Sequence, residues 1–170
     1  MKRLQSRLLL LAGFLLVFPL FLRRRRRVER HIAIMASPEE IFPYFNDLRN
    51  WPLWTEWGRR DAMAFSYGAQ SLGEGAVQRW RNSWMSGEMR IVRTEENARI
   101  DYEVEIPRSA PFLGRILLQK DGACTRVTWR CVWEMADNPY RRYFDLLIQK
   151  LLQRDFASSL ERLKSIVEND

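Results

Sequence analysis

The chain begins with an uncharged apolar block of fifteen residues that starts at Leu8 and ends at Leu22. Three basic residues precede the block, and five consecutive arginines follow it: Arg23, Arg24, Arg25, Arg26 and Arg27. An apolar block between two basic blocks predicts a membrane-spanning helix. At about 1.5 Å per residue the block spans roughly 22 Å, and a helix that starts at Leu4 spans roughly 28 Å, close to a hydrocarbon core of about 30 Å. The pattern therefore predicts an N-terminal anchor over residues 1–27.

Two other interpretations of this block stay open. A cleaved secretory signal has the same basic start, but the arginines directly after Leu22 do not resemble a small-residue cleavage site. A peripheral amphipathic helix needs a polar face, whereas this block is apolar on all sides. Six Lys/Arg follow the block by Arg30 and three precede it, so the positive-inside rule places the domain in the cytoplasm. We expect a single-pass membrane protein, in the inner membrane if the source is a bacterium, with the arginine run against anionic lipid headgroups.

After the arginines the pattern predicts one strand and two short helices. Residues 28–35 alternate between apolar and polar positions, as a strand does. Ser37, Pro38 and Glu40 form the signature of a capping box with proline at the first helical position, so a helix begins there. A second short helical segment begins at Trp51.

In the rest of the domain the spacing of apolar residues changes twice, first to that of strands and then to that of a helix. Between residues 61 and 134 apolar residues occupy every second position in six successive runs separated by turn residues, which predicts an antiparallel meander. From Asn138 to about Glu168 the apolar residues return to helical spacing, over roughly 45 Å. This helix is the only predicted element long enough to cover one face of the whole sheet. The fold class is α+β, with a seven-stranded antiparallel curved sheet around a long C-terminal helix.

This order of elements is the helix-grip arrangement, and the sequence resembles the START-like or SRPBCC superfamily, in particular its polyketide cyclase/dehydrase branch. The matching stretches include Ala-Ser-Pro-Glu-Glu-Ile-Phe at residues 36–42, and the others are residues 46–54, 73–76, 87–91, 111–112 and 125–129. The resemblance implies one domain over residues 28–170, with a deep apolar cavity between the sheet and the long helix. It says little about activity, because this superfamily includes lipid carriers, hormone receptors and cyclases.

The inward positions of the predicted elements carry large apolar side chains, which suit the lining of a pocket. The same side chains suit a packed core, and both interpretations stay open. Trp54 is expected near the mouth of the cavity that the resemblance implies. The pocket candidates are Trp54, Met63, Phe65, Tyr67, Gln78, Trp80, Met89, Tyr102, Val104, Trp129, Trp133, Phe144 and Ile148.

No group of residues indicates a catalytic site. His31 is the only histidine and lies on the polar side of the first predicted strand, so no histidine cluster can bind a metal. Nucleophile elbows, phosphate-binding loops and dinucleotide fingerprints are absent from the sequence. Asp101, Glu103 and Glu105 occupy outward strand positions. We expect no cofactor and no metal.

The net charge of +7 belongs to the anchor rather than to the domain. Residues 1–30 hold nine Lys/Arg and one Glu, a net charge of +8, so the remaining 140 residues carry a net charge of −1. A nucleic-acid partner would need a basic surface on the domain, so this balance argues against one. Cys124 and Cys131 lie on one predicted strand, roughly 23 Å apart, and cannot form a disulfide with each other.

Three functions remain open. The one we favour is a membrane-tethered module that binds or transfers an apolar small molecule such as a lipid, an isoprenoid or a polyketide. The others are a regulatory or assembly protein with a non-functional cavity and a cyclase-type enzyme. If Trp80, Tyr102 and Trp129 line a pocket, Trp129 should be the most core-like, and Tyr102→Phe should leave stability nearly unchanged. The oligomeric state does not follow from the sequence.

Overall fold

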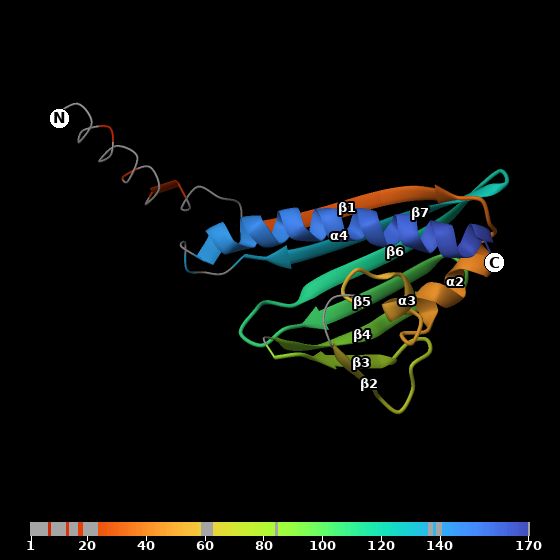
Figure 1. The fold of residues 1–170 in the computed structure, drawn as a ribbon, viewed down its shortest axis with the longest axis horizontal. Coiled ribbons are helices and arrows are strands. Elements are labelled where there is room, and N and C mark those ends of the chain that lie inside the picture. The colour runs from red at the N-terminus through yellow and green to blue at the C-terminus, as the bar shows by residue number, and fades with distance from the viewer. Residues whose placement is uncertain are drawn as a thin grey trace.

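The domain is a curved antiparallel sheet that packs against one long helix and two short ones (Figure 1). The structure, a computed structural model, describes residues 24–58, 63–83, 85–135, 138 and 141–169, together with residues 7, 13, 17 and 18, and for residues 141–143 the backbone alone. The elements are β1 (Arg25–Ile34), α2 (Pro38–Asn46), α3 (Trp51–Trp54), β2 (Ala64–Tyr67), β3 (Val77–Arg81), β4 (Ser86–Glu95), β5 (Arg99–Glu105), β6 (Phe112–Asp121), β7 (Cys124–Glu134) and α4 (Arg141–Asn169).

The sheet has the strand order β1-β7-β6-β5-β4-β3-β2, and all neighbouring strands are antiparallel. Strands β2 to β7 follow one another as hairpins, and β1 closes the far edge by pairing with β7. The predicted seven-stranded antiparallel sheet with a long C-terminal helix is confirmed.

β1 begins at Arg25, three residues before the predicted start of the strand. Arg25 pairs with Glu134, and Arg26 and Arg27 continue the ladder with β7. Arg27 also forms an ion pair with Glu29, with 2.6 Å between Nη2 and Oε2. These three arginines, predicted as the basic flank of an anchor, are strand residues. A run of identical charged residues carries no alternation, so only the backbone ladder to β7 reveals the strand.

The helix signals in the sequence are confirmed. Ser37 Oγ accepts a hydrogen bond from Glu40 N at 3.4 Å, and Glu40 Oε2 accepts one from Ser37 N at 2.7 Å, which completes the capping box of α2. α3 is a single turn with Trp51 and Trp54 at its two ends. α4 extends over 29 residues, to Asn169.

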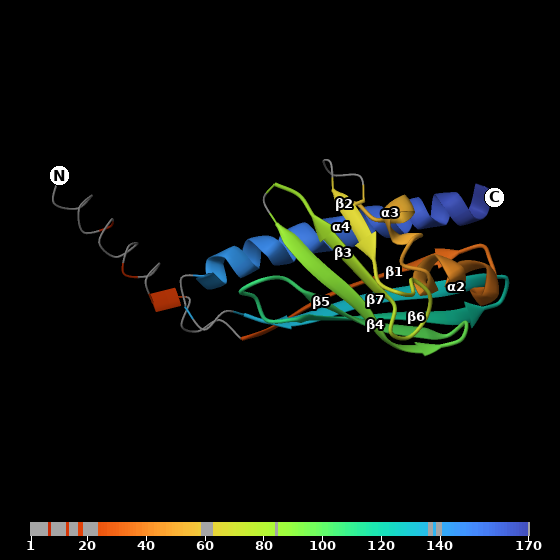
Figure 2. The same ribbon diagram turned by 90° about the horizontal axis from the view of Figure 1, so that it is seen from below.

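α4 runs along the β1 side of the sheet rather than across the whole inner face (Figure 1). Gln149 Nε2 donates to the Arg27 carbonyl at 3.3 Å near the start of the helix, and Lys164 Nζ donates to the Ala33 carbonyl at 3.0 Å near its end. α3 lies beside the C-terminal half of α4, where Ser159 Oγ accepts a hydrogen bond from Glu56 N at 2.9 Å (Figure 2). The inner face of the sheet is therefore shared between α4 and α3 because α4 alone follows only one edge.

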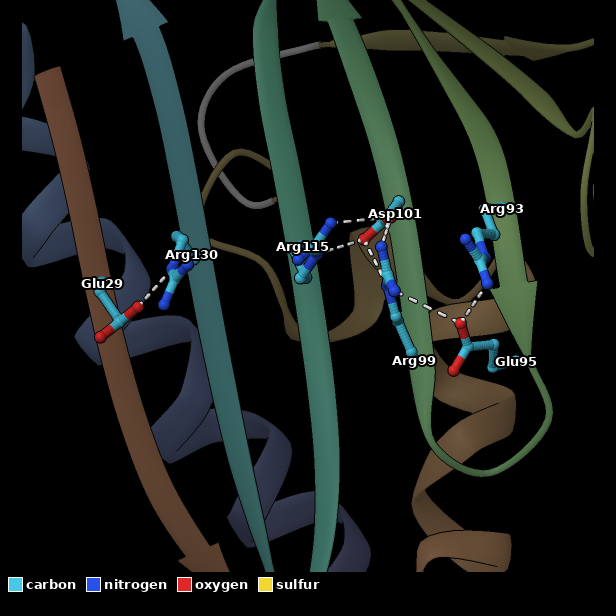
Figure 3. Close-up of polar contacts among 7 residues, drawn as sticks. All are labelled: Glu29, Arg93, Glu95, Arg99, Asp101, Arg115 and Arg130. Carbon is cyan, nitrogen blue, oxygen red and sulfur yellow. Dashed lines mark hydrogen bonds and ion pairs between the residues drawn. The ribbon is translucent and has the colours of Figure 1, made fainter. Parts of the chain in front are cut away.

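The outer face of the sheet carries cross-strand ion pairs (Figure 3). Asp101 on β5 accepts hydrogen bonds from Arg99 and from Arg115 Nε, the latter at 2.7 Å. Burial acts to raise the pKa of Asp101, but the hydrogen bonds from the two arginines outweigh it and lower that pKa. Glu29 on β1 pairs with Arg130 on β7 at 2.5 Å. The predicted outward position of Asp101 is confirmed, and this face is a solvated ionic surface of modest energetic value.

The predicted anchor lies almost wholly outside the described residues. In the described part of the chain, no helix combines the length and the apolar character that crossing a bilayer requires.

Candidate functional site

The centre of the grip is filled by aromatic rings, the central aromatic cluster. Trp129 of β7 stacks on Phe156 of α4 with ring centroids 3.7 Å apart and an interplanar angle of 6°. Trp54 packs edge-on against Trp129 at 5.2 Å, and Trp51 against Tyr102 at 5.1 Å. The Trp51, Trp54 and Trp129 side chains are 0% exposed. Well-oriented ring pairs of this kind stabilise a core beyond their buried area, so the middle of the predicted cavity is packed protein.

Tyr102 is held in this cluster by a hydrogen bond and by a glycine. Its hydroxyl oxygen accepts a hydrogen bond from Trp129 Nε1 at 2.6 Å, and both residues are buried. Gly114 on β6 lies under the ring, since a Cβ there would lie 1.9 Å from Tyr102 Cζ. Burial raises the pKa of Tyr102 well above its usual value, so the phenol is neutral. The expectation that Tyr102→Phe leaves stability unchanged is therefore revised, because the substitution would orphan the buried Trp129 N–H.

Trp54 is not near a mouth but in the middle of the core. Residues three apart on a helix lie on the same face, so Trp51 and Trp54 of the one-turn α3 enter the core together. The Trp54 Nε1 donates to the Tyr44 carbonyl at 3.0 Å.

The other pocket candidates divide by their exposure. Met89, Tyr102, Trp129 and Trp133 are buried, as is Gln78 at 1% exposed. Tyr67 and Val104 are half-buried beside the core, and Met63 lies just before β2, also half-buried. Phe65, Trp80 and Ile148 are half-buried, and Phe144 is exposed. Trp129 is the most buried of Trp80, Tyr102 and Trp129, as the sequence predicted.

The less buried residues lie at one end of the grip, which we call the open end. The ladder register places Trp80 opposite Gly87, Val104 opposite Phe112, and Trp133 opposite Arg26. Val104 also pairs with Met89, so Val104, Phe112, Trp133 and Arg26 follow one row from β5 to β1, and Trp80 lies two residues beyond that row, toward the turn between β3 and β4. Gln149, bonded to the Arg27 carbonyl, sets the N-terminal half of α4 above the same row.

An open cleft of about 680 Å³ lies at the β3 side of this end. Phe65 and Trp80 form an apolar wall together with the connection from β5 to β6, where Ile106 lies. Trp80 lies flat on Gly87, since a Cβ on that glycine would lie 2.4 Å from the indole. The polar part of the lining includes Arg79, whose Nε lies 2.8 Å from Glu88 Oε2. The cleft is therefore lined by both apolar and ionic residues.

Two buried donors at the open end have no hydrogen-bond partner among the described residues: Trp133 Nε1 and Arg26 Nη2. Trp133 is 3% exposed, and its ring packs against Phe112 at 5.4 Å. Arg26 uses Nε for a 3.1 Å contact with Met135 Sδ. A buried donor without an acceptor destabilises the folded state. A ligand oxygen that reaches Trp133 Nε1 or Arg26 Nη2 would accept this hydrogen bond and gain binding energy from it. Across the sheet Gln78 Nε2 donates to the Leu48 carbonyl at 2.9 Å, and Gln78 Oε1 has no donor within the described part of the chain.

The sequence analysis missed one buried carboxylate. Asp155 of α4 is 5% exposed and lies one turn before Ser159, on the side of the helix that meets α3. It follows a helical apolar pattern without interrupting it, so nothing in the sequence marks it as buried. Asp155 is not among the described residues that line the cleft. Within the described ranges, no three His, Cys, Asp or Glu side chains are grouped as a metal site would require.

Comparisons with known proteins agree with the fold. Protein TTHA0849 from Thermus thermophilus is 20% identical with a TM-score of 0.60, and the match covers 84% of this chain and 97% of that chain. Protein CV1439 from Chromobacterium violaceum is 16% identical with a TM-score of 0.60, covering 85% of this chain and 98% of that chain. DynU16, described as a putative protein in the dynemicin biosynthetic locus, is 13% identical with a TM-score of 0.58, and the match covers 84% of this chain and 47% of that one. No curated protein sequence matches the chain.

A family model settles the relationship. The model described as "Polyketide cyclase / dehydrase and lipid transport" matches residues 25–168. The match begins at Arg25, where β1 also begins, and it includes all the described strands as well as α2, α3 and nearly all of α4. The chain therefore belongs to the polyketide cyclase/dehydrase and lipid transport family of the SRPBCC superfamily.

Proposed function

We propose that the domain binds an apolar small molecule at the open end of the grip and that residues 8–22 tether it to a membrane. One observation carries the binding part of the proposal. Inward-facing apolar side chains are fully buried around the central aromatic cluster but remain partly exposed at the open end, where Phe65 and Trp80 form one wall of the cleft. Partly exposed aromatic side chains in a concave site are typical of ligand pockets.

The polar groups at this end narrow the chemistry of the ligand. A purely apolar molecule would leave Trp133 Nε1 and Arg26 Nη2 without acceptors. Neither residue lines the cleft, so a ligand held against Trp80 reaches them only by extending along the inner face of the sheet over Phe112. A carboxylate, ester or carbonyl oxygen at its far end would then satisfy both donors. An acyl lipid or a polyketide acid has this composition, and an unfunctionalised isoprenoid does not.

The test measures uptake of a fluorescent fatty acid by the full chain in detergent, with native mass spectrometry of protein released gently from membranes. Trp80→Ala should weaken binding severalfold and cost less stability than a fully buried tryptophan would, because the indole is only partly buried. The control is Val92→Ser, which changes an apolar side chain that is 39% exposed and does not line the cleft. Absence of bound lipid together with no uptake by the parent would defeat the proposal.

The regulatory or assembly alternative has an observation of its own. The central aromatic cluster occupies the space where the family resemblance implies a cavity, and three of its tryptophans are 0% exposed. If the parent protein takes up no ligand, this filled centre makes the regulatory role the better explanation.

A further inference from the structure

The N-terminal half of α4 presents an apolar face without a covering element among the described residues. Phe144 is 62% exposed, Leu147 61% and Leu151 41%. Their spacing of three and four places them above one another on one side of the helix. In the C-terminal half Phe156, Leu160 and Leu163 are at most 2% exposed, and at about 100° per residue they lie on the opposite side of the helix from the exposed face. The same helix therefore packs on the core with one side and carries an exposed apolar surface on the other side of its N-terminal half.

This exposed face lies at the end of the domain where β1 begins (Figure 1). The bond from Gln149 to the Arg27 carbonyl fixes the third turn of α4 beside the first residues of β1. The uncharged block ends at Leu22, so only Arg23 and Arg24 separate it from Arg25, the first residue of β1. Leu22 and Arg25 are three residue steps apart, which is at most about 11 Å, so the first strand begins directly beside the end of the block. A domain tethered by this block must keep its α4 start against the headgroups.

The charge at this end suits an anionic bilayer. The sequence places Arg141 and Arg142 in the first turn of α4, and the arginine run lies at the start of β1. Glu134, Asp137 and Asp145 are the acidic residues in the sequence from the end of β7 through Asp145. Basic residues that flank exposed Phe and Leu side chains on a helix are the pattern of interfacial helices.

We propose that the exposed face of α4, formed by Phe144, Leu147 and Leu151, inserts into the headgroup region of an anionic bilayer. Interfacial helices enter this region to a depth of about 5–10 Å. Phe144 and Leu147 enter first because they are nearest the tether, and Leu151, roughly 10 Å further along the helix axis, requires α4 to incline toward the surface. This inference rests on the tether in the proposed function.

The test uses the full chain in nanodiscs of phosphatidylcholine with phosphatidylglycerol. A nitroxide label is attached at Leu147→Cys in a Cys124→Ser background, while the native Cys131 is 4% exposed and stays unlabelled. The control label is at Ala157→Cys, an exposed position in the C-terminal half of the same helix. We expect the label at 147 to show a severalfold higher ratio of oxygen to nickel-chelate collisions than the label at 157.

Three results would overturn the inference or its basis, and they are distinguishable. Equal, water-like collision ratios at both positions would refute insertion while the tether stands. Dipolar broadening between labels at 147 on different copies would assign the face to a second copy of the chain. Extraction of the protein by sodium carbonate, measured in parallel on native membranes, would remove the tether and with it the membrane part of the proposed function.

Discussion

Tyr102→Phe should destabilise the domain although it removes a single oxygen atom. That oxygen accepts the 2.6 Å hydrogen bond from Trp129 Nε1, and Trp129 is 0% exposed. Without it the indole N–H remains in the core with no acceptor, which costs about 1–3 kcal/mol. At roughly 4 °C per kcal/mol for a domain of this size, the unfolding midpoint should fall by about 4–12 °C.

The control is Tyr67→Phe, which removes the same atom in a different environment. The Tyr67 hydroxyl lies 3.4 Å from Gln78 Nε2, but that nitrogen also donates to the Leu48 carbonyl at 2.9 Å. No donor is orphaned, so the loss should be below about 0.5 kcal/mol.

Both variants are measured in a fragment that begins at Arg24, by far-UV circular dichroism during thermal and urea unfolding. Equal losses for the two variants, or no loss for Tyr102→Phe, would refute the argument that the Trp129 bond carries the difference. Adding Trp129→Phe to Tyr102→Phe removes the orphaned donor, so the two changes should be less than additive.

Three further outcomes follow from the packing and charge of the domain. Gly114→Ala should cost about 1–3 kcal/mol in urea unfolding, because its Cβ would lie 1.9 Å from Tyr102 Cζ; a variant as stable as the parent would contradict that contact. The folded-state pKa of Asp101 lies below its ordinary value of 3.8, so its stabilisation is present above that pH and is lost as the pH falls through the lowered pKa. Below about pH 4 the parent should therefore lose stability more steeply than Asp101→Asn, and parallel slopes would argue against it. Burial raises the pKa of Cys131 to about 12 while Cys124 is only half-buried, so iodoacetamide at about pH 8 should label Cys124 alone in the folded chain and both thiols after unfolding, as read by mass spectrometry.

The fold could be predicted from the sequence because its signals are local. The capping box at Ser37 and the alternation from β2 to β7 depend on neighbouring residues, and both are confirmed. The start of β1 could not be predicted, because Arg25 to Arg27 become a strand only through a ladder with residues more than a hundred positions later. The path of α4 along one edge depends on where α3 packs, which helical periodicity does not encode.

The sequence predicted which residues point inward, but it did not predict where between them a cleft remains open. Alternation identifies Trp80 and Tyr102 as inward. Trp80 is only partly buried and lines the cleft, whereas Tyr102 is buried and hydrogen-bonded to Trp129. The difference comes from α3, whose two tryptophans fill the centre of the grip and leave its end open. Trp133 Nε1, which has no hydrogen-bond partner among the residues that the structure describes, is likewise placed by tertiary packing, and no pattern in the sequence marks it.

The adjacency of β1 and β7 bears on how the chain is assembled during synthesis. β1 is the first strand to leave the ribosome and β7 the last, and the bond from Arg130 to Glu29 joins residues 101 positions apart. Closing so long a loop costs chain entropy before its contacts repay it, so the local hairpins of β2 to β7 should form first. With residues 8–22 inserted as proposed, β1 would stay unpaired beside the bilayer while the hairpins of β2 to β7 form. The last step of folding would then be the return of β7 and α4 to β1 at the membrane surface.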